Sequence, residues 1–244
     1  MGYKFKIMTK LIFDIETIGE DWESLDEITK ESLTRWIKKD AFSEEAAQSA
    51  LANVKEGLGF SPYTGEIVAI GVLEVETSKG AVYFQAPGSA IKDFEADGIK
   101  YRVLTEKVML ENFWQGAINY TEFVSFNGRG FDVPFLMMRS AINGVRPTKD
   151  LMSNRYLNSQ KFNALHIDLM DQLTFYGAVA RRPSLHLACR AFGIKSPKAN
   201  GVKGDDVKGL FKTKEYQKIA QYNAGDLFAT KELYKKWEQY LNIK

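Results

Sequence analysis

Four carboxylates stand where side-chain oxygens could hold metal ions: Asp14, Glu16, Asp132 and Asp226. Asp14 and Glu16 belong to an apolar run, residues 11–17, that is typical of a buried strand, and its period of two puts both acids on one face. Adjacent buried carboxylates repel each other, which raises at least one pKa unless a divalent ion with oxygen ligands offsets the charge. Together the four acids indicate metal-dependent hydrolysis of phosphodiester bonds.

The third acid follows an expected strand. Residues 122–126 are typical of a strand and residues 131–142 of a helix, which places Asp132 in the first helical turn. Exposed amides and the helix dipole favour a carboxylate there, and Pro134 is tolerated near a helix start. Asp132 is therefore expected where a loop passes into a helix, although a purely helix-stabilising acid would occupy the same place.

The last acid forms a pair with a tyrosine. A long helix or a helix pair is expected over 215–240. Tyr222 and Asp226 are four residues apart in it, so both project from one helical face. A phenol there can hold or deprotonate a water molecule next to a metal ion. Taken alone, the pair fits a core tyrosine and a solvated acid at least as well.

The other motifs are also individually common, and what distinguishes the chain is their order. Asp-x-Glu often follows an apolar run, and Asn127 in Asn127-Gly128-Arg129-Gly130 fits a simple turn. In this chain an acid pair on the first strand is followed by Asn-x-x-x-Phe-Asp after a later strand and by Tyr-x-x-x-Asp on the last helix.

The remaining pattern interleaves helices and strands, which predicts a mixed α/β fold. The first three strands are expected to be antiparallel. We expect one domain over residues 1–244, with a helical insertion at about residues 20–60. The expected helices are 21–39, 43–56 with Ser43 as N-cap, 105–119 capped by Thr105, and 184–192 ended by Gly193; the other strands are 66–75, 81–85 and 165–169.

Composition narrows the functional classes. The 244 residues are 45% hydrophobic and carry a net charge of only +2, so the whole chain is not a polybasic nucleic-acid clamp, although a local basic groove stays possible. The single Cys189 excludes an intramolecular disulfide and a cysteine zinc cluster. Because no apolar stretch is long enough for a bilayer and the start lacks a signal-peptide pattern, the expected location is the cytoplasm.

The chain resembles the DEDDy 3′–5′ exonucleases of the ribonuclease-H-like fold, and among them the predicted exonucleases related to the proofreading domain of family B DNA polymerases. Tyr222 argues for the tyrosine subclass, since no histidine follows His186. The resemblance implies a mixed five-stranded sheet with helices on both faces and the helical insertion between strands one and two. It is carried by residues 13–17, 65–71, 126–134, 166–169, 193–198, 204–207 and 222–226.

The resemblance also implies roles for named residues. The four acids Asp14, Glu16, Asp132 and Asp226 would coordinate two Mg²⁺ or Mn²⁺ ions, and Tyr222 would orient or activate the attacking water. The 3′ end of a nucleic acid, with DNA favoured over RNA, would be trimmed one nucleotide at a time. Three more residues would meet the substrate: Thr17 and Asn127 would contact the terminal nucleotide, and Phe131 would pack under the site or stack on a base.

One departure is the stretch of about fifty residues between Glu16 and the second strand. Its Trp22 and Trp36 could cover a cleft or simply attach the helices to the core. Other charged residues indicate the function of the chain less clearly. Lys195, Lys198 and Lys203 fit phosphate contacts or a solvated loop, His166 and His186 are interpreted as structural, Asp171 as a surface acid, and Asp205 with Asp206 as the start of a short helix.

Three functions stay open on the sequence alone. They are a DNA 3′–5′ exonuclease, an exoribonuclease with the same chemistry, and a nucleic-acid-binding module without catalysis. The presence of all four acids and Tyr222 argues against the third. Separating the first two requires knowing whether the cleft accepts a 2′-hydroxyl group.

Overall fold

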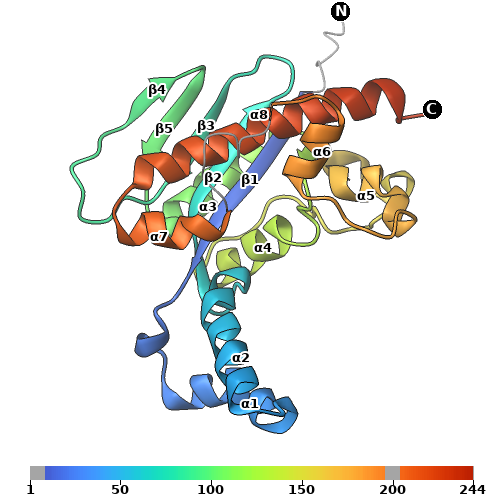
Figure 1. Ribbon diagram of the computed structural model, residues 1–244. Coiled ribbons are helices and arrows are strands. Elements are labelled where there is room, and N and C mark those ends of the chain that lie inside the picture. The colour runs from blue at the N-terminus through green and yellow to red at the C-terminus, as the bar shows by residue number, and fades with distance from the viewer. Residues whose placement is uncertain (1–8, 196–203, 244) are drawn as a thin grey trace, which may run out of the picture.

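The computed structural model describes residues 9–195 and 204–243. Its centre is a mixed sheet of seven strands in the order β4-β5-β3-β2-β1-β6-β7 (Figure 1). Strands β1, β2 and β3 are antiparallel as expected, whereas β6 runs parallel to β1 and β7 parallel to β6. The bounds are β1 Lys10–Gly19, β2 Gly65–Glu74, β3 Gly80–Phe84, β4 Phe94–Ala96, β5 Ile99–Val103, β6 Glu122–Ser125 and β7 Leu165–Asp168.

The expected number of five strands was wrong, because β4 and β5 extend the sheet beyond β3. Strand β5 pairs in parallel with β3, and the three-residue β4 forms the edge. Asp97 and Gly98 connect them, both with positive φ, as in the tight turns of β-hairpins. An Asp-Gly pair is a known hairpin signal, but strands of three and five residues give too short an alternation to be recognised.

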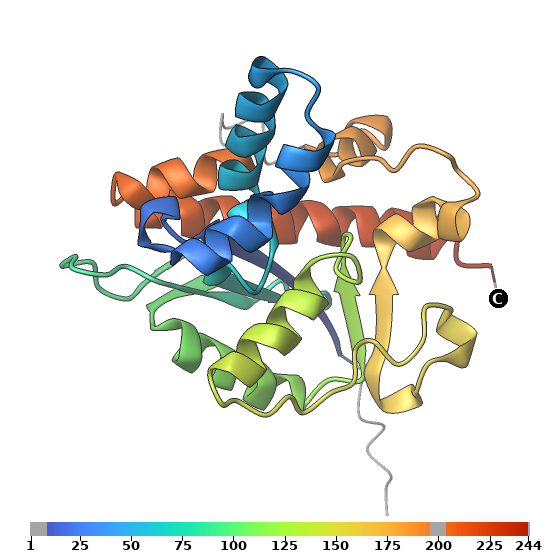
Figure 2. The same cartoon turned by 90° about the horizontal axis from the view of Figure 1, so that it is seen from below.

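Helices cover both faces of the sheet, which confirms the expected α/β arrangement (Figure 2). One face packs against α6, α7 and α8, and the other against α3 and α4. The bounds are α1 Glu27–Asp40, α2 Glu44–Gly57, α3 Glu106–Ala117, α4 Asp132–Ile142, α5 Leu169–Leu173, α6 Leu185–Ala191, α7 Val207–Lys212 and α8 Tyr216–Tyr240.

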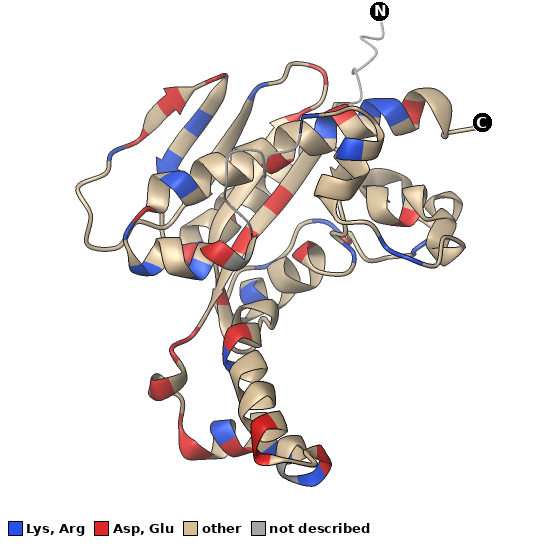
Figure 3. Cartoon of the chain, in the orientation of Figure 1, with Lys and Arg blue, Asp and Glu red and all other residues tan. Residues whose placement is uncertain are grey.

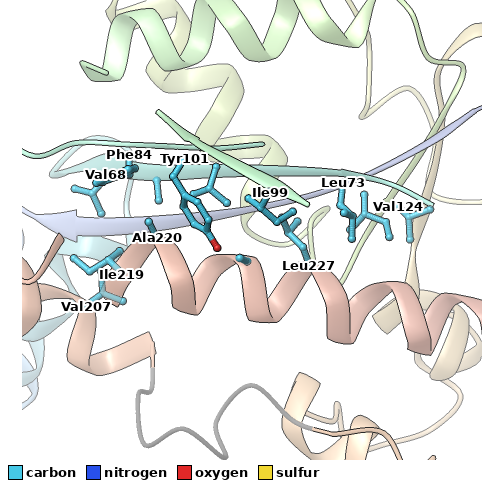
Figure 4. Packing of buried hydrophobic residues seen from close by; sticks show 14 of the residues in the cluster. Val68, Leu73, Phe84, Ile99, Tyr101, Val124, Val207, Ile219, Ala220 and Leu227 are labelled. Carbon is cyan, nitrogen blue, oxygen red and sulfur yellow. The ribbon is translucent and has the colours of Figure 1, made fainter. Parts of the chain in front are cut away.

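The long helix α8 lies along one face of the sheet. It is a single helix of 25 residues, and its apolar side packs on β1, β2 and β3. Figure 4 shows Ala220 of α8 on the side of Val68 and Phe84 of the sheet, and Leu227 of α8 below Ile99. Strand β1 is one of the strands that α8 covers. The buried polar residues Asn223 and Asp226 of α8 therefore lie on the side of the helix that faces the sheet.

On the opposite face, buried Glu106 joins three elements. Its carboxylate accepts from the Ile67 amide of β2 at 2.8 Å and forms a two-pronged pair with Arg139 of α4, also at 2.8 Å. Thr105 does precede α3 as expected, but its side chain makes no capping hydrogen bond. The attachment of α3 and α4 to β2 therefore depends on Glu106, which was not singled out from the sequence.

The insertion between β1 and β2 forms the helical pair α1 and α2, which extends beyond the sheet (Figure 1). Ser43 caps α2 as expected, with its side chain accepting from the Ala46 amide. Neither Trp22 nor Trp36 joins the cores on the sheet, so the interpretation that they attach the helices to the core was wrong. Trp22 lies under Lys55, and Trp36 is 48% exposed with its indole donating to Leu33 within α1.

Two short 3₁₀ turns, Trp22–Ser24 and Leu58–Phe60, connect the insertion to the sheet. Acidic and basic residues are interspersed over the insertion rather than separated by sign (Figure 3). Within the described ranges, no helix has both the length and the apolar character that crossing a bilayer would require. The expectation of one domain over residues 1–244 stays a prediction.

Candidate active site

Strand β1 carries the first two acids just beyond the point where its pairing with β6 ends. Strand β6 pairs with β1 through Lys10, Leu11 and Ile12, and the pairing ends there in the described part of the chain. Asp14 and Glu16 follow on the side of the sheet that α8 covers, whereas Phe13 and Ile15 belong to the core on the other side. The alternation expected from the sequence is therefore confirmed.

Helix α4 approaches the open side of β1. The Ile15 amide, which lies between the two acids and no longer faces β6, donates to Asp132 Oδ1 at 3.0 Å. Asp132 is buried at the first position of α4, as expected from its place after β6. The bond fixes the third acid beside the acid pair, although 117 residues separate its two partners.

Helix α8 brings the fourth acid from the other end of the chain. One carboxylate oxygen each from Asp14, Glu16 and Asp226 lies within 4.8 Å of the others. Asp132 does not join this closest group, but its charge acts on Asp14 and Glu16. The sequence prediction that the four acids meet at one site is consistent with this arrangement.

The cluster is electrostatically unfavourable by itself. Burial, followed by the charges of Asp132, Asp226 and Glu16, raises the pKa of Asp14 well above its ordinary value. Burial and the charges of Asp226 and Asp132 do the same to the pKa of Glu16, and burial raises the pKa of Asp132 to about 7. Crowded hard oxygen donors of this kind fit a divalent cation, which removes the repulsion and the burial cost.

Tyr222 lies beside the acids, one turn before Asp226. Burial and the nearby charges of Asp226, Glu16 and Asp14 raise the pKa of its phenol far above the ordinary value, and a hydrogen bond with Asp226 adds to the effect. The phenol therefore keeps its proton beside the charged acids. The arrangement allows Tyr222 to donate a hydrogen bond within the site.

Asn223 is a site residue that sequence reasoning missed. It is fully buried, and its amide nitrogen donates to Asp14 Oδ2 at 2.8 Å. Within the described part of the chain, its Oδ1 is buried without a hydrogen-bond partner. Gly71, which lies opposite Asp14 in β2, makes the room, because a Cβ there would come within 2.0 Å of Asn223 Oδ1. Asn223 is a polar residue next to Tyr222, on the side of the helix expected to be buried. This position is the sequence signal that could have identified it as a site residue.

Of the three expected substrate contacts, Thr17 directly follows Glu16 and Phe131 directly precedes Asp132, whereas Asn127 lies in the turn before Phe131. The Thr17 hydroxyl donates to the Gly59 carbonyl at 2.7 Å, on the turn that follows the insertion. The ring of Phe131 packs against Phe135 and Phe60, directly before Asp132 in the chain. Asn127 has a positive φ of 65°, so the turn interpretation holds for its backbone. Their contacts to a nucleotide stay predictions.

Asp168 organises the loop that leads to Asp132. Its carboxylate accepts from the amides of Asn127 and Arg129 at 2.8 and 2.9 Å and also from Met170. His166 is buried, lies 2.8 Å from Ser125 Oγ, and has a pKa lowered to about 4 by burial. These contacts support the structural interpretation of His166.

Of the other charged residues, Asp171 was wrongly interpreted as an ordinary surface acid, because Arg155 Nε donates to its Oδ2 at 3.0 Å and the acid is partly buried. Lys195 and His186 are exposed. The start of a helix at Asp206 is confirmed by the turn Gly204–Asp206 that leads into α7. Lys198 and Lys203 lie outside the described residues.

Comparison with known proteins assigns most of the chain to a family. Residues 65–242, more than half of the chain, match a family model described as a predicted 3′–5′ exonuclease related to the exonuclease domain of PolB. The match begins after the insertion, so Asp14 and Glu16 precede it. No curated protein matches the chain.

Among solved structures, the chain is similar to the family B DNA polymerase from the hyperthermophilic archaeon Pyrobaculum calidifontis. The TM-score is 0.54 at 17% sequence identity, over 95% of this chain and 24% of the polymerase. The chain thus spans about a quarter of the polymerase's length. This likeness concerns the fold, and it confirms the ribonuclease-H-like α/β class.

Proposed function

Because the chain belongs to the family of predicted 3′–5′ exonucleases related to the exonuclease domain of PolB, we propose that it removes nucleotides one at a time from the 3′ end of DNA, single-stranded in preference. The products would be nucleoside 5′-monophosphates. The observation that carries the proposal is the meeting of Asp14, Glu16 and Asp226, from opposite ends of the chain, within 4.8 Å. We place the reaction in the cytoplasm.

The acids would hold two divalent cations, Mg²⁺ or Mn²⁺, with Asp14, Glu16 and Asp226 as the closest donors and Asp132 beside them. Bound there, such ions supply charge stabilisation at the phosphoryl oxygens during an in-line displacement. Neighbouring residues hold the carboxylates of the site in fixed positions. Asn223 fixes the carboxylate of Asp14, and the backbone of β1 fixes that of Asp132 through Ile15.

Tyr222 would orient the attacking water by donating a hydrogen bond to it, since its phenol keeps the proton next to the charged acids. Orientation of a nucleophile relative to the scissile phosphorus is a recognised source of rate enhancement. The 3′-terminal nucleotide would contact Thr17, Asn127 and Phe131, of which Thr17 follows Glu16 and Phe131 precedes Asp132 in the chain.

The deciding experiment follows oligonucleotides of equal length, labelled at the 5′ or at the 3′ end, with Mg²⁺, with Mn²⁺ and with EDTA. We expect a ladder of 5′-labelled products shortened from the 3′ end, stronger for single-stranded DNA than for RNA or duplex. Internal cuts would show an endonuclease instead. Binding without cleavage in either metal would show an inert binding module, and a faster RNA ladder would show an exoribonuclease.

Tyr222→Phe tests the assignment of the phenol. We expect about 100-fold slower hydrolysis with an unchanged affinity for Mn²⁺, because the variant loses the hydroxyl donor and keeps the carboxylates. Single-turnover rates and calorimetric Mn²⁺ titration measure the two effects. A large fall in Mn²⁺ affinity would contradict the role of Tyr222 as a water-orienting residue.

Asn223→Ala tests whether the amide positions Asp14. Partners that orient a ligand typically contribute 10- to 100-fold to metal affinity, so we expect a loss of that size in Mn²⁺ binding. Asn119→Ala is the matched control, because Asn119 is exposed and its side chain donates within its own turn, to the Gly116 carbonyl. Equal Mn²⁺ affinities of Asn223→Ala and the wild type would show that Asp14 needs no such partner.

A further inference from the structure

Two of the cavities that border strand β1 differ in their relation to the acids. The larger, about 630 Å³, lies near Leu11, Glu74 and Tyr120 and includes none of the expected site residues. The second, about 400 Å³, is in the size range of small-ligand sites and lies at the end of β1 that follows the acid pair. Thr17, which directly follows Glu16, is in its wall; the wall also includes Gly19, Glu56, Gly59, Phe60 and Lys208.

Phe60 is an unusual member of this wall. It is 63% exposed, although it is a large apolar side chain on a well-fixed turn. Its ring meets the ring of Phe131 edge to face, with centroids 6.4 Å apart. Because Phe131 directly precedes Asp132, Phe60 extends an aromatic surface from the acid cluster towards the insertion.

The backbone that carries Phe60 is held in place from two sides. Thr17 donates to the Gly59 carbonyl, and Thr64 donates to the Leu58 carbonyl at 2.8 Å. Gly19 and Gly59 pack so closely that a Cβ on Gly19 would lie 2.6 Å from the Gly59 nitrogen. The exposed ring is thus presented by rigid backbone, which lowers the entropy cost of stacking a ligand on it.

The charges of the wall argue for the kind of ligand. Among the described residues of the wall, Glu56 and Lys208 are the charged ones, and their opposite charges balance. These residues therefore give no net attraction for a free phosphate ion. An exposed aromatic ring with polar groups around it suits a flat heteroaromatic ring, and unpaired nucleobases stack on such rings in single-stranded nucleic-acid sites. A base within a duplex already has stacking partners and a paired edge.

We propose that Phe60 is a stacking platform for an unpaired nucleobase of the strand whose 3′ end lies among the acids. The proposal rests on the proposed function for the direction of the strand, and it makes the insertion a determinant of the preference for single strands. The family match begins at residue 65, so neither Phe60 nor its cavity wall around Thr17 and Gly19 belongs to the matched region.

The test measures binding of a 5′-fluorescein-labelled hexathymidylate to the full chain in EDTA, by fluorescence anisotropy, and therefore needs no catalysis. We expect Phe60→Ala and Phe60→Leu to weaken binding at least about fivefold, and Phe60→Tyr to bind as the wild type does, because only the tyrosine keeps a stacking ring. A duplex carrying the same strand should bind more weakly to the wild type and respond less to these variants.

Phe42→Ala is the matched control. Phe42 is 94% exposed in the same insertion, between α1 and α2, and α2 separates it from the turn of Phe60 by 14 residues, or about 20 Å of helix. We expect its affinity for hexathymidylate to equal that of the wild type. Unchanged binding by Phe60→Ala, equal losses for the two alanine variants, or binding by Phe60→Leu as tight as the wild type would overturn the proposal.

Failure of this proposal and failure of the proposed function are distinguishable. Hydrolysis of thymidine 5′-(p-nitrophenyl phosphate) by the wild type, with Mn²⁺ present, reports the acid cluster without a strand to stack. Hydrolysis of this ester together with Phe60-independent binding overturns only the stacking platform. Phe60-dependent binding without any hydrolysis of ester or oligonucleotide supports the platform and overturns the exonuclease.

Discussion

Asp14→Ala is expected to reduce exonuclease turnover by at least about 1,000-fold while the protein remains folded. Asp14 is at the centre of the cluster, since it shares the 4.8 Å group with Glu16 and Asp226 and also feels the charge of Asp132. Metal ions contribute several kcal/mol of transition-state stabilisation, and each 1.36 kcal/mol corresponds to a factor of ten in rate. Rates under single-turnover conditions at saturating Mn²⁺ measure the loss.

Neutralising Asp14 is expected to lower turnover but not the stability of the metal-free fold. Removing one negative charge relieves Glu16 and Asp132, but alanine leaves the Asn223 amide without its acceptor, which costs about 1–3 kcal/mol. Asp14→Asn avoids this loss, because its amide oxygen can still accept from Asn223. We therefore expect Asp14→Asn to be as inactive as Asp14→Ala and to have a higher Tm in EDTA than the wild type.

Glu111→Gln is the matched control for both variants. Glu111 is an exposed acid on α3, so its neutralisation removes the same charge without touching the cluster. Its turnover and Tm should stay close to those of the wild type. Parallel losses of Tm and turnover in the two Asp14 variants would mean that Asp14 holds the fold together rather than the metal ions.

The parts of the site that the sequence predicted are those with a local pattern. Residues 12–16 of β1 alternate between the two faces of the sheet before the register shifts after Glu16, so the shared face of Asp14 and Glu16 followed from the period of two. Helix α2 begins after Ser43 because the serine side chain accepts from Ala46, a contact over three residues. Such interactions act within one turn or one strand, and the order of the residues alone specifies them.

Contacts between distant segments could not be predicted in the same way. The bond from Ile15 to Asp132 joins residues 117 apart, and that from Asn223 to Asp14 joins residues 209 apart. Each depends on the ends of strands and helices meeting in three dimensions. For Asn223 it also depends on Gly71, whose missing side chain leaves the space, and a single glycine in a strand does not indicate what fills that space.

The insertion shows a third case, in which the elements were predicted and their placement was not. Both helices were expected, but apolar residues on α1 and α2 were as compatible with packing on the sheet as with an extension from it. The structure has Trp36 half exposed and attaches the insertion through the turns around Trp22 and Phe60. The direction of the insertion depends on close contact between Gly19 and Gly59, which no periodicity reveals.

The second large effect is expected in the stability of the metal-free protein, which should fall as the pH rises from 6.5 to 8.5. The folded-state pKa of Asp132 is raised to about 7, and those of Asp14 and Glu16 are raised well above their ordinary values, chiefly by burial. Between the unfolded pKa near 4 and these raised values, the folded chain binds more protons than the unfolded chain. Its free energy of unfolding therefore decreases with increasing pH.

The size of this decrease follows from the number of groups that lose a proton. One group contributes at most about 1.4 kcal/mol per pH unit, and 1 kcal/mol corresponds to about 2–4 °C in Tm for a chain of this size. A fall in Tm of about 5–10 °C over the two pH units is expected in EDTA. His166 offsets only a small part of this fall, because its folded-state pKa of about 4 keeps the folded imidazole neutral. The unfolded imidazole, with a pKa near 6.5, loses its remaining protons at the start of the range and adds on the order of 0.5 kcal/mol in the opposite direction.

Divalent ions should reverse the trend, because they bind the charged form of the same carboxylates. Binding to the folded state alone adds about 2.7 kcal/mol at an ion concentration 100 times the Kd, and the gain increases with pH as the acids lose their protons. Differential scanning fluorimetry at 0.5 pH-unit steps, with EDTA or with Mn²⁺, measures both curves. Asp14→Asn should flatten the EDTA curve, whereas Glu111→Gln should leave it unchanged. A wild-type Tm in EDTA that stays constant or rises over this range would show that the acids are not crowded in the metal-free fold, and the physical argument for cations between them would fail.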